Sequence, residues 1–347
     1  MVFDEYNRRF ASFSRRRNGA MNLYLLDTNA NYQAFLKSHN VRGVNTSGIF
    51  LIQPTIEGVV VLAGEMKRSE VFGVLQHEGF HQFASNYLGR GLPIWLNEGL
   101  AEYFEDGVIV DGRMKLGIAS QSRLVVLRDA IRKNRHVPFA QLINMTPGAW
   151  AMTLHRNKTK AGVLYDQAWS VVYFLVHGDN GRYRHQFDRY IELLSQRVNP
   201  QTAYERAFAG INVDSLAARW KHFVRTTESN PVSLAKLRMQ FLGEGLKVLH
   251  QHQQPMPSNT EQLEKKLRAI KLQTELTQNG AKIVMKASDD DLYRYESPHG
   301  IRSRFMLLEP SRDDLPPRLS APGLRPEPTL IWVRDAGDKL VYEFEYR

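Results

Sequence analysis

The spacing of apolar residues predicts that the chain begins with a mixture of helices and strands. Phe3, Tyr6 and Phe10 recur at helical intervals and indicate an amphipathic first helix. Short apolar runs bounded by turn residues follow, which is the pattern of strands. The expected elements are strands at residues 22–26, 48–53 and 58–62 and a helix at residues 32–38. The run at residues 58–62 contains three consecutive valines, so we expect this strand to be central or nearly central in its sheet.

Two helices joined by a short loop are expected next. Ser69 can cap a helix at residues 70–88, and Gly89 would end it. Pro93 suits the first turn of the second helix, which Gly107 closes. Because the connection between them is short, the second helix can return alongside the first.

The rest of the chain is predicted to hold a helical part and a small separate module. Asp111-Gly112 indicates a hairpin turn within residues 108–118. Helical periodicity continues to about residue 228 and resumes before a segment rich in Gln, Pro and Ser, which is typical of a linker. We therefore expect an α+β fold. Its expected parts are an α/β part at 1–118, a helical part at 119–250, a linker at 251–260 and a small α+β module at 261–347.

The composition is that of an ordinary globular protein and limits the possible chemistry. The 347 residues are 43% hydrophobic and 24% charged, which excludes a disordered or collagen-like chain. The chain has no cysteine, so disulfides, thiolate catalysis and cysteine-bound metals are excluded. Any metal must therefore be held by histidines and carboxylates.

The net charge of +10 does not predict a nucleic-acid partner. Residues after position 228 include 18 basic and 16 acidic side chains, so most of the positive excess lies earlier, where it is scattered. The dense run Arg15 to Arg17 is short and lacks interleaved aromatic residues, so a solvated basic face is the favoured interpretation. No apolar stretch is long enough for a membrane span, and the charged first twenty residues lack the apolar core of a signal peptide.

The helix expected at residues 70–88 contains the pattern H-E-x-x-H, which is typical of a metal site. His77 and His81 are four residues apart, so their side chains project from one helix face about 6 Å apart along the axis and can bind the same ion. Glu78 points about a quarter-turn away, where it can take a proton from a water without binding the metal. The pattern predicts Zn²⁺ as the cofactor.

A second pair of acidic residues follows at a useful distance. Glu98 and Glu102 share one face of the next helix, and we expect Glu98 to be the third ligand, opposite the two histidines. Glu102 could accept the free imidazole N–H of a ligand histidine. Alone, two such carboxylates would more often be solvated, but the preceding motif favours ligation. The longer zincin motif is absent, because Ala84 and Tyr87 occupy the positions of its glycine and third histidine.

Residues 77–81 and 92–104 together resemble the gluzincin metallopeptidases, specifically the bacterial family DUF1570, also called peptidase MA-like. The resemblance continues at residues 165–169 and at Trp220, and it covers roughly residues 1–225. It implies a zincin-like fold with a small mixed sheet, the H-E-x-x-H helix and a helical subdomain. It also implies a set of roles: zinc ligands His77, His81 and Glu98, general base Glu78, and supporting carboxylate Glu102.

The expected function is zinc-dependent hydrolysis of a peptide or protein substrate. Zinc would polarise the scissile carbonyl and acidify a water, while Glu78 accepts its proton. Tyr165, expected at the start of a helix, is a candidate donor to the oxyanion, with a place in the aromatic core as an equal alternative. A strand at 48–53 or 58–62 could pair with an extended peptide. The rival is a non-catalytic scaffold, zinc-stabilised or metal-free, whose basic face binds an anionic partner, but a scaffold has no need of the base.

Overall fold

The computed structural model describes residues 2–11, 22–41, 46–89, 91–156, 158–278, 281–297, 299–335 and 337–347. It is a mixture of helices and small sheets, which confirms the α+β class. The chain divides into two compact units. The first unit holds residues 1–107, 112–117 and 124–227, and the second holds residues 108–111, 118–123 and 228–347.

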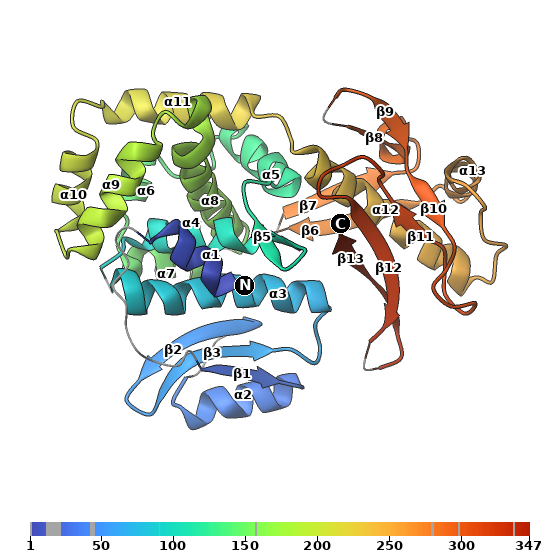
Figure 1. The fold of residues 1–347 in the computed structure, drawn as a ribbon, viewed down its shortest axis with the longest axis horizontal. Coiled ribbons are helices and arrows are strands. Elements are labelled where there is room, and N and C mark those ends of the chain that lie inside the picture. Colours follow the sequence, from blue (N-terminus) through green and yellow to red (C-terminus); the bar gives the residue numbers. More distant parts are fainter. Residues whose placement is uncertain are drawn as a thin grey trace. The chain divides into compact units, whose positions relative to one another are not determined.

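A three-stranded sheet forms the N-terminal part of the first unit (Figure 1). Its strands are β1 (Leu23–Leu26), β2 (Gly48–Gln53) and β3 (Ile56–Leu62). The order is β1-β3-β2, with β1 parallel and β2 antiparallel to β3. The valine-rich strand is therefore central, as predicted, and it begins two residues earlier than expected. The edge strand β2 is joined to β3 through a two-residue loop at Pro54.

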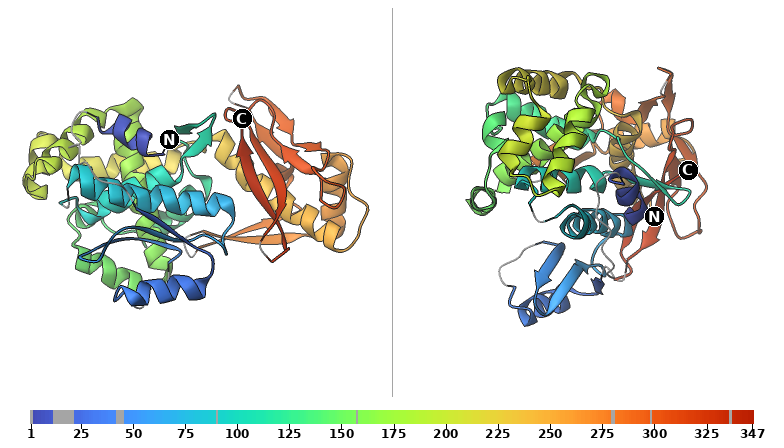
Figure 2. Two further views of the ribbon diagram at one scale, coloured as in Figure 1. Left: turned by 60° about the horizontal axis from the view of Figure 1, so that its bottom comes forward. Right: turned by 60° about the vertical axis from the view of Figure 1, so that its left-hand side comes forward.

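A helix covers each face of this sheet. Tyr32 and Leu36 of α2 (Asn29–Ser38) pack in a core with Leu51, Ile56 and Val60. Helix α3 (Arg68–Phe83) packs on the other face of β2 and β3. In both views of Figure 2 the sheet lies between α2 and α3. Helix and edge strand approach closely at Gly48, where a Cβ would lie 2.2 Å from Cγ1 of Val74. Glycine at this position brings β2 against the helix that carries the H-E-x-x-H motif.

The motif helix differs from the prediction at its start. It begins at Arg68, with Lys67 rather than Ser69 at the N-cap, and the Lys67 backbone N–H donates to the Glu70 side chain at 3.0 Å. The first helix, α1 (Val2–Arg9), packs against it through Tyr6, whose hydroxyl donates to the Gln76 carbonyl at 2.5 Å. After Phe83 the helix continues as one π-helical turn, η1 (Ala84–Leu88), and ends at Gly89 with a φ of 99°. The predicted stop at Gly89 is confirmed.

The helical part of the first unit surrounds two buried helices, α4 (Ile94–Glu105) and α8 (Lys158–Gly181). Ala168, Val171 and Val172 of α8 have no exposed area. The two helices meet at Gly99, where a Cβ would lie 2.6 Å from the Ala168 carbonyl oxygen. The other helices are α5 (Gln121–Arg132), which spans residues of both units, α6 (Phe139–Ile143), α7 (Pro147–Arg156), α9 (Arg184–Ser195), α10 (Pro200–Ala207) and α11 (Val213–Thr226).

Two short strands lie on either side of the predicted hairpin turn. They are β4 (Val108–Val110) and β5 (Arg113–Lys115). Asp111 and Gly112 between them have φ values of 49° and 72°, the left-handed conformation that a tight two-residue turn requires. The turn prediction is confirmed.

The second unit is built around one helix, α12 (Pro231–Gln251). Its buried residues share one core with α13 (Thr260–Ala269) and with the strands of a four-stranded sheet in the order β10-β11-β12-β13. The strands of this unit are β6 (Gln273–Gln278), β7 (Ala281–Lys286), β8 (Arg294–Glu296), β9 (Arg302–Arg304), β10 (Met306–Leu308), β11 (Arg318–Ser320), β12 (Pro328–Arg334) and β13 (Leu340–Tyr346), and a short 3-10 helix, η2, spans Asp290–Tyr293.

The predicted linker at 251–260 therefore differs from the structure. This segment lies inside the second unit, where Pro257 is buried and Met256 packs against the shared core. Because α12 buries its apolar face in the C-terminal module, the boundary shifts to Thr227 and Glu228.

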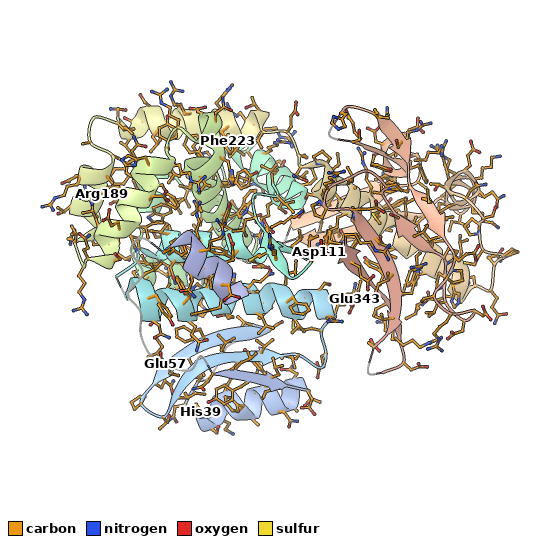
Figure 3. All side chains as sticks on the ribbon, in the orientation of Figure 1. His39, Glu57, Asp111, Arg189, Phe223 and Glu343 are labelled. Atoms are coloured by element: carbon orange, nitrogen blue, oxygen red, sulfur yellow. The ribbon has the colours of Figure 1, made fainter. Side chains whose placement is uncertain are left out.

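Charged side chains are exposed on both helices and strands of the described residues. Arg189 on α9 and Glu57 on β3 are both exposed, as Figure 3 shows. Among the described residues, no helix combines the length and apolar character that a membrane crossing needs. The run Arg15 to Arg17 lies outside the described residues.

Candidate metal centre

Helix α3 presents the two motif histidines side by side. Their ring centroids are 4.8 Å apart, and both side chains are largely buried, with exposed fractions of 14% for His77 and 13% for His81. The four-residue spacing produces this arrangement, because residues four apart stack on one helix face.

Helix α4 brings a carboxylate to the same place. Glu98 Oε2 lies 3.6 Å from Nε2 of His77 and 3.6 Å from Nε2 of His81. The close approach of α4 and α8 at Gly99 and the buried Trp95 fix the face that α4 turns toward α3. The structure thus brings together all three predicted ligands.

The 3.6 Å separations fit metal ligands better than direct hydrogen bonds. Hydrogen bonds between nitrogen and oxygen measure about 2.7–3.2 Å. Two ligands bound tetrahedrally to one zinc at about 2.0–2.2 Å lie roughly 3.4 Å from each other. One ligand atom from each of His77, His81 and Glu98 lies within 4.8 Å of the other two, so the donor set has the types and spacing that zinc takes.

A second carboxylate stands behind His77, and it is not the one predicted. Nδ1 of His77 lies 3.1 Å from Oε2 of Glu105 and 3.8 Å from Oε1 of Glu102. Only the first distance is that of a hydrogen bond. Glu105 follows Glu98 by seven residues and so shares its helix face, a signal the sequence contained. With Nε2 turned toward Glu98, Nδ1–H donates to Glu105, and this fixes the tautomer and the orientation of the ring.

Glu78 lies beside the cluster without joining it. Its Oε2 accepts a hydrogen bond of 2.8 Å from the backbone N–H of Phe50 on β2. It is absent from the groups of described residues that could hold a metal ion. The edge strand β2 and the motif helix α3 together therefore orient this carboxylate. Because Phe50 acts through its backbone N–H, its residue type could not indicate this role.

Tyr165 lies seven residues inside α8 rather than at the start of a helix. Its ring packs edge-on against Trp150 of α7, with centroids 5.3 Å apart. Burial raises the pKa of its hydroxyl, and the negative charges of Glu98, Glu102 and Glu78 raise it further. Tyr165 is therefore close enough to the carboxylates to respond to them, as well as part of an aromatic pair.

The charges of the cluster are coupled. Burial lowers the pKa of His77, but the hydrogen bond to Glu105 and the negative charge of the nearby Glu98 outweigh this effect, and the net pKa is raised well above its ordinary value. Glu98 has the same effect on His81, whose pKa is also raised against the opposing effect of burial. Burial acts to raise the pKa of Glu98, but the two histidines hold it well below its usual range. A cation and these imidazole protons compete for the same nitrogen atoms.

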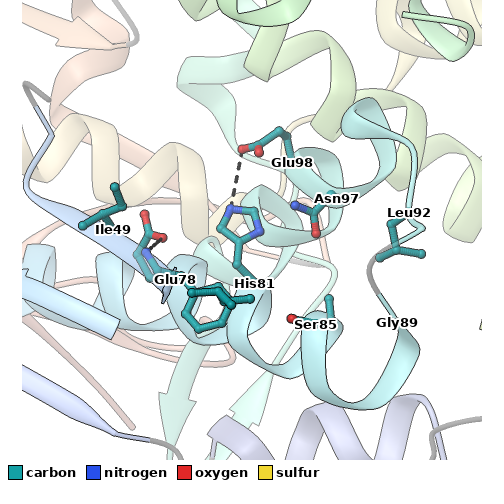
Figure 4. Close-up of a pocket in the computed structure, with 11 residues that line it drawn as sticks. Ile49, Glu78, His81, Ser85, Gly89, Leu92, Asn97 and Glu98 are labelled. Atoms are coloured by element: carbon teal, nitrogen blue, oxygen red, sulfur yellow. Dashed lines mark hydrogen bonds and ion pairs between the residues drawn. The ribbon is translucent and has the colours of Figure 1, made fainter. Parts of the chain in front are cut away.

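A cleft of about 370 Å³ opens beside these groups (Figure 4). Glu78, His81 and Glu98 form its polar wall. The remaining lining comes from β2, from η1 and from the residues before Glu98: Ile49, Phe50, Ile52, Ala84, Ser85, Gly89, Leu92 and Asn97. Sequence reasoning did not identify this lining, because its members are ordinary uncharged residues that only the fold brings together.

Comparison with known protein families gives a match to part of the chain. No curated protein and no solved structure matched it. Residues 72–200, which include both motif helices and Tyr165, match the family described as "Protein of unknown function (DUF1570)".

Proposed function

We propose that this chain is a zinc metallopeptidase of the gluzincin type with a zincin-like fold. The observation that carries the proposal is the convergence of His77, His81 and Glu98 at 3.6 Å, with Glu78 held outside that set. Structural zinc sites usually have four protein ligands, whereas catalytic sites have three and face a cleft. The cluster here follows the catalytic pattern.

Each group of the chain then has a defined task. A bound zinc ion would supply a Lewis acid that polarises the scissile carbonyl and lowers the pKa of the attacking water. Glu78 accepts the proton of that water and passes it to the leaving amine. The Phe50 N–H fixes Oε2 of Glu78, so the other carboxylate oxygen exchanges the proton.

Tyr165 is proposed to donate a hydrogen bond to the oxyanion. Because burial and the nearby carboxylates raise the pKa of its hydroxyl, the group stays protonated at neutral pH and keeps its donor. The proposal for Tyr165 rests on this electrostatic proximity and on its place on the helix packed behind α4.

The test measures zinc content and peptide hydrolysis on matched variants. Glu78→Gln removes the proton acceptor but no ligand, so zinc should remain at one per chain while kcat falls by about 10² to 10⁴. Glu98→Gln replaces an anionic ligand with a weak neutral one, so zinc should be lost together with activity. Glu57→Gln, at an exposed glutamate of β3, is the control and should change neither.

Two outcomes would contradict the proposal. A fully active Glu78→Gln variant would remove the assigned base. A wild-type chain that binds zinc but cleaves no peptide of a diverse library would favour the non-catalytic scaffold instead.

A further inference from the structure

The residues that line the cleft indicate which substrate side chains it can accept. Its charged and metal-ligating groups lie on one wall only. Beyond Glu78, His81 and Glu98, the lining side chains are uncharged. Phe50, Ile52, Ala84 and Leu92 supply apolar surface, and Ser85 and Asn97 supply neutral polar groups. A charged substrate side chain placed there would lose water without gaining an opposite charge, which is costly.

Strand β2 faces this cleft with an unpaired edge. Among the described residues it pairs with β3 and with no other strand, and the two-residue loop makes Gln53 and Ile56 the pair nearest the turn. In antiparallel pairs, backbone groups alternate between the partner strand and the open side. The Phe50 N–H, which donates to Glu78, shows which residues face outward. Ile52, two residues further on, therefore also presents its backbone N–H and C=O to the open side.

An extended peptide can add to this edge as a fourth strand. Antiparallel pairing is the more stable arrangement per residue, so the peptide would run from Ile52 toward Gly48. The reacting bond must lie near Phe50, where Glu78 is held. Each strand residue spans about 3.3 Å, so Ile52 meets substrate residues just N-terminal to that bond.

The rest of the cleft lining comes from residues that follow His81 and from the loop before α4. Ala84 and Ser85 follow His81 in the π-helical turn, and Leu92 precedes α4. Figure 4 shows Ser85 and Leu92 on the side of His81 opposite to Glu78. The Ser85 hydroxyl is buried and has no hydrogen-bond partner among the described residues. This end of the cleft is therefore a partly buried surface of mixed apolar and neutral polar character, with Ile52 37% exposed.

We propose that this surface, formed by Ile52, Ala84, Ser85 and Leu92, is a specificity subsite. It takes an apolar, uncharged side chain within two residues on the N-terminal side of the scissile bond. The inference rests on the proposed peptidase function and adds the substrate class: extended peptide segments that carry an apolar residue at this position.

The first experiment is a cleavage profile of the zinc-loaded wild-type chain on a mixed peptide library, with cut sites read by mass spectrometry. Leu, Ile, Met or Phe should be enriched at one of the two positions before the cut. Leu92→Asp should reverse this preference toward Lys and Arg by at least tenfold in kcat/KM ratio, with zinc content unchanged. Leu25→Asp, at a side chain 54% exposed on the other edge strand, is the matched control and should leave the profile unaltered.

The second experiment measures binding without turnover. Zinc-loaded Glu78→Gln should bind a fluorescein-labelled library peptide with Leu at this position at least tenfold more tightly than the same peptide with Lys. Adding Leu92→Asp should invert that order. Peptide binding with this preference, but without any cleavage by the wild type, would overturn the peptidase and leave the subsite standing.

Other results would overturn the subsite. Cleavage whose apolar preference lies only after the cut would show that the peptide runs the other way. Cleavage that Leu92→Asp does not redirect would refute the subsite while the peptidase stands. The absence of both cleavage and selective binding would refute both.

Discussion

His77 faces three carboxylates that α4 presents at intervals of four and three residues. Glu98 lies on its Nε2 side, while Glu105 and Glu102 lie on its Nδ1 side. The exposed fraction of the Glu102 side chain is 8%, against 35% for Glu105. The hydrogen bond to His77 is thus made by Glu105, the more exposed of the two residues. Motif spacing alone had pointed to Glu102.

Substitution distinguishes the two supporting carboxylates. Glu105→Gln keeps the shape but weakens the acceptor of the His77 Nδ1–H, so zinc affinity should fall by about 10- to 100-fold. Glu102→Gln should reduce it by less, because its contact is 3.8 Å long. Competition with a coloured zinc chelator measures both affinities. A larger loss of zinc affinity with Glu102→Gln than with Glu105→Gln would show that Glu102 is the carboxylate that supports His77.

The raised pKa values of His77 and His81 predict how zinc binding depends on pH. Their protons are retained above the ordinary histidine pKa of about 6.5, so zinc must displace them, and its affinity should rise with pH. In the zinc-free chain these histidines contribute stability that is complete below about pH 6.5 and is lost as pH rises through their raised pKa values.

The increase in Tm on adding zinc should therefore be small near pH 6 and larger at pH 8. Thermal unfolding with zinc, and with a chelator in its place, measures the difference at each pH. Equal increases at both pH values would show that the histidines are not protonated in the zinc-free chain.

Tyr165→Phe removes a hydroxyl and keeps the ring packed against Trp150. If the hydroxyl stabilises the oxyanion, kcat should fall by about 10² or more while zinc content and Tm stay nearly constant. A peptide turnover assay at saturating substrate measures the effect. Unchanged kcat would mean that Tyr165 serves only the aromatic core.

Helix and strand signals predicted most of the elements around the site, because they depend on local sequence. The valine run of β3, the turn at Pro54 and the helix stop at Gly89 are examples. What local sequence could not show is which segments meet. The hydrogen bond from the Phe50 backbone to Glu78 joins residues 28 positions apart, and the cleft lining gathers three separate segments.

The contact of α4 with α8 gives a prediction at the scale of elements. Gly99→Ala would place a Cβ 2.6 Å from the Ala168 carbonyl, and since backbone cannot yield as a side chain can, the overpacking should cost about 1–3 kcal/mol. Gly73→Ala in α3 is the control, because its Cβ would meet Glu105 at an ordinary 3.5 Å, and it should stabilise the helix by up to about 1 kcal/mol. Denaturant unfolding measures both, and an unaffected Gly99→Ala variant would refute the tight contact.

At the scale of the whole molecule, truncated chains test where the boundary between the two units lies. The Gln-, Pro- and Ser-rich composition of residues 251–260 predicted a linker, but composition does not show that α12 buries Met239, Phe241 and Leu246 against the C-terminal strands. A chain that ends at residue 250 would keep α12 and lose the partners of its apolar face. A chain that ends at Thr227 would lose helix and partners together.

The two truncations should therefore behave oppositely. The chain that ends at residue 227 should remain soluble and bind one zinc, because His77, His81 and Glu98 all belong to the first unit. The chain that ends at residue 250 should self-associate through the exposed face of α12. Size-exclusion chromatography with zinc quantification compares them. A monomeric, zinc-bound chain ending at residue 250, beside an insoluble one ending at residue 227, would show that α12 belongs with the metal-binding unit and that the boundary lies after it.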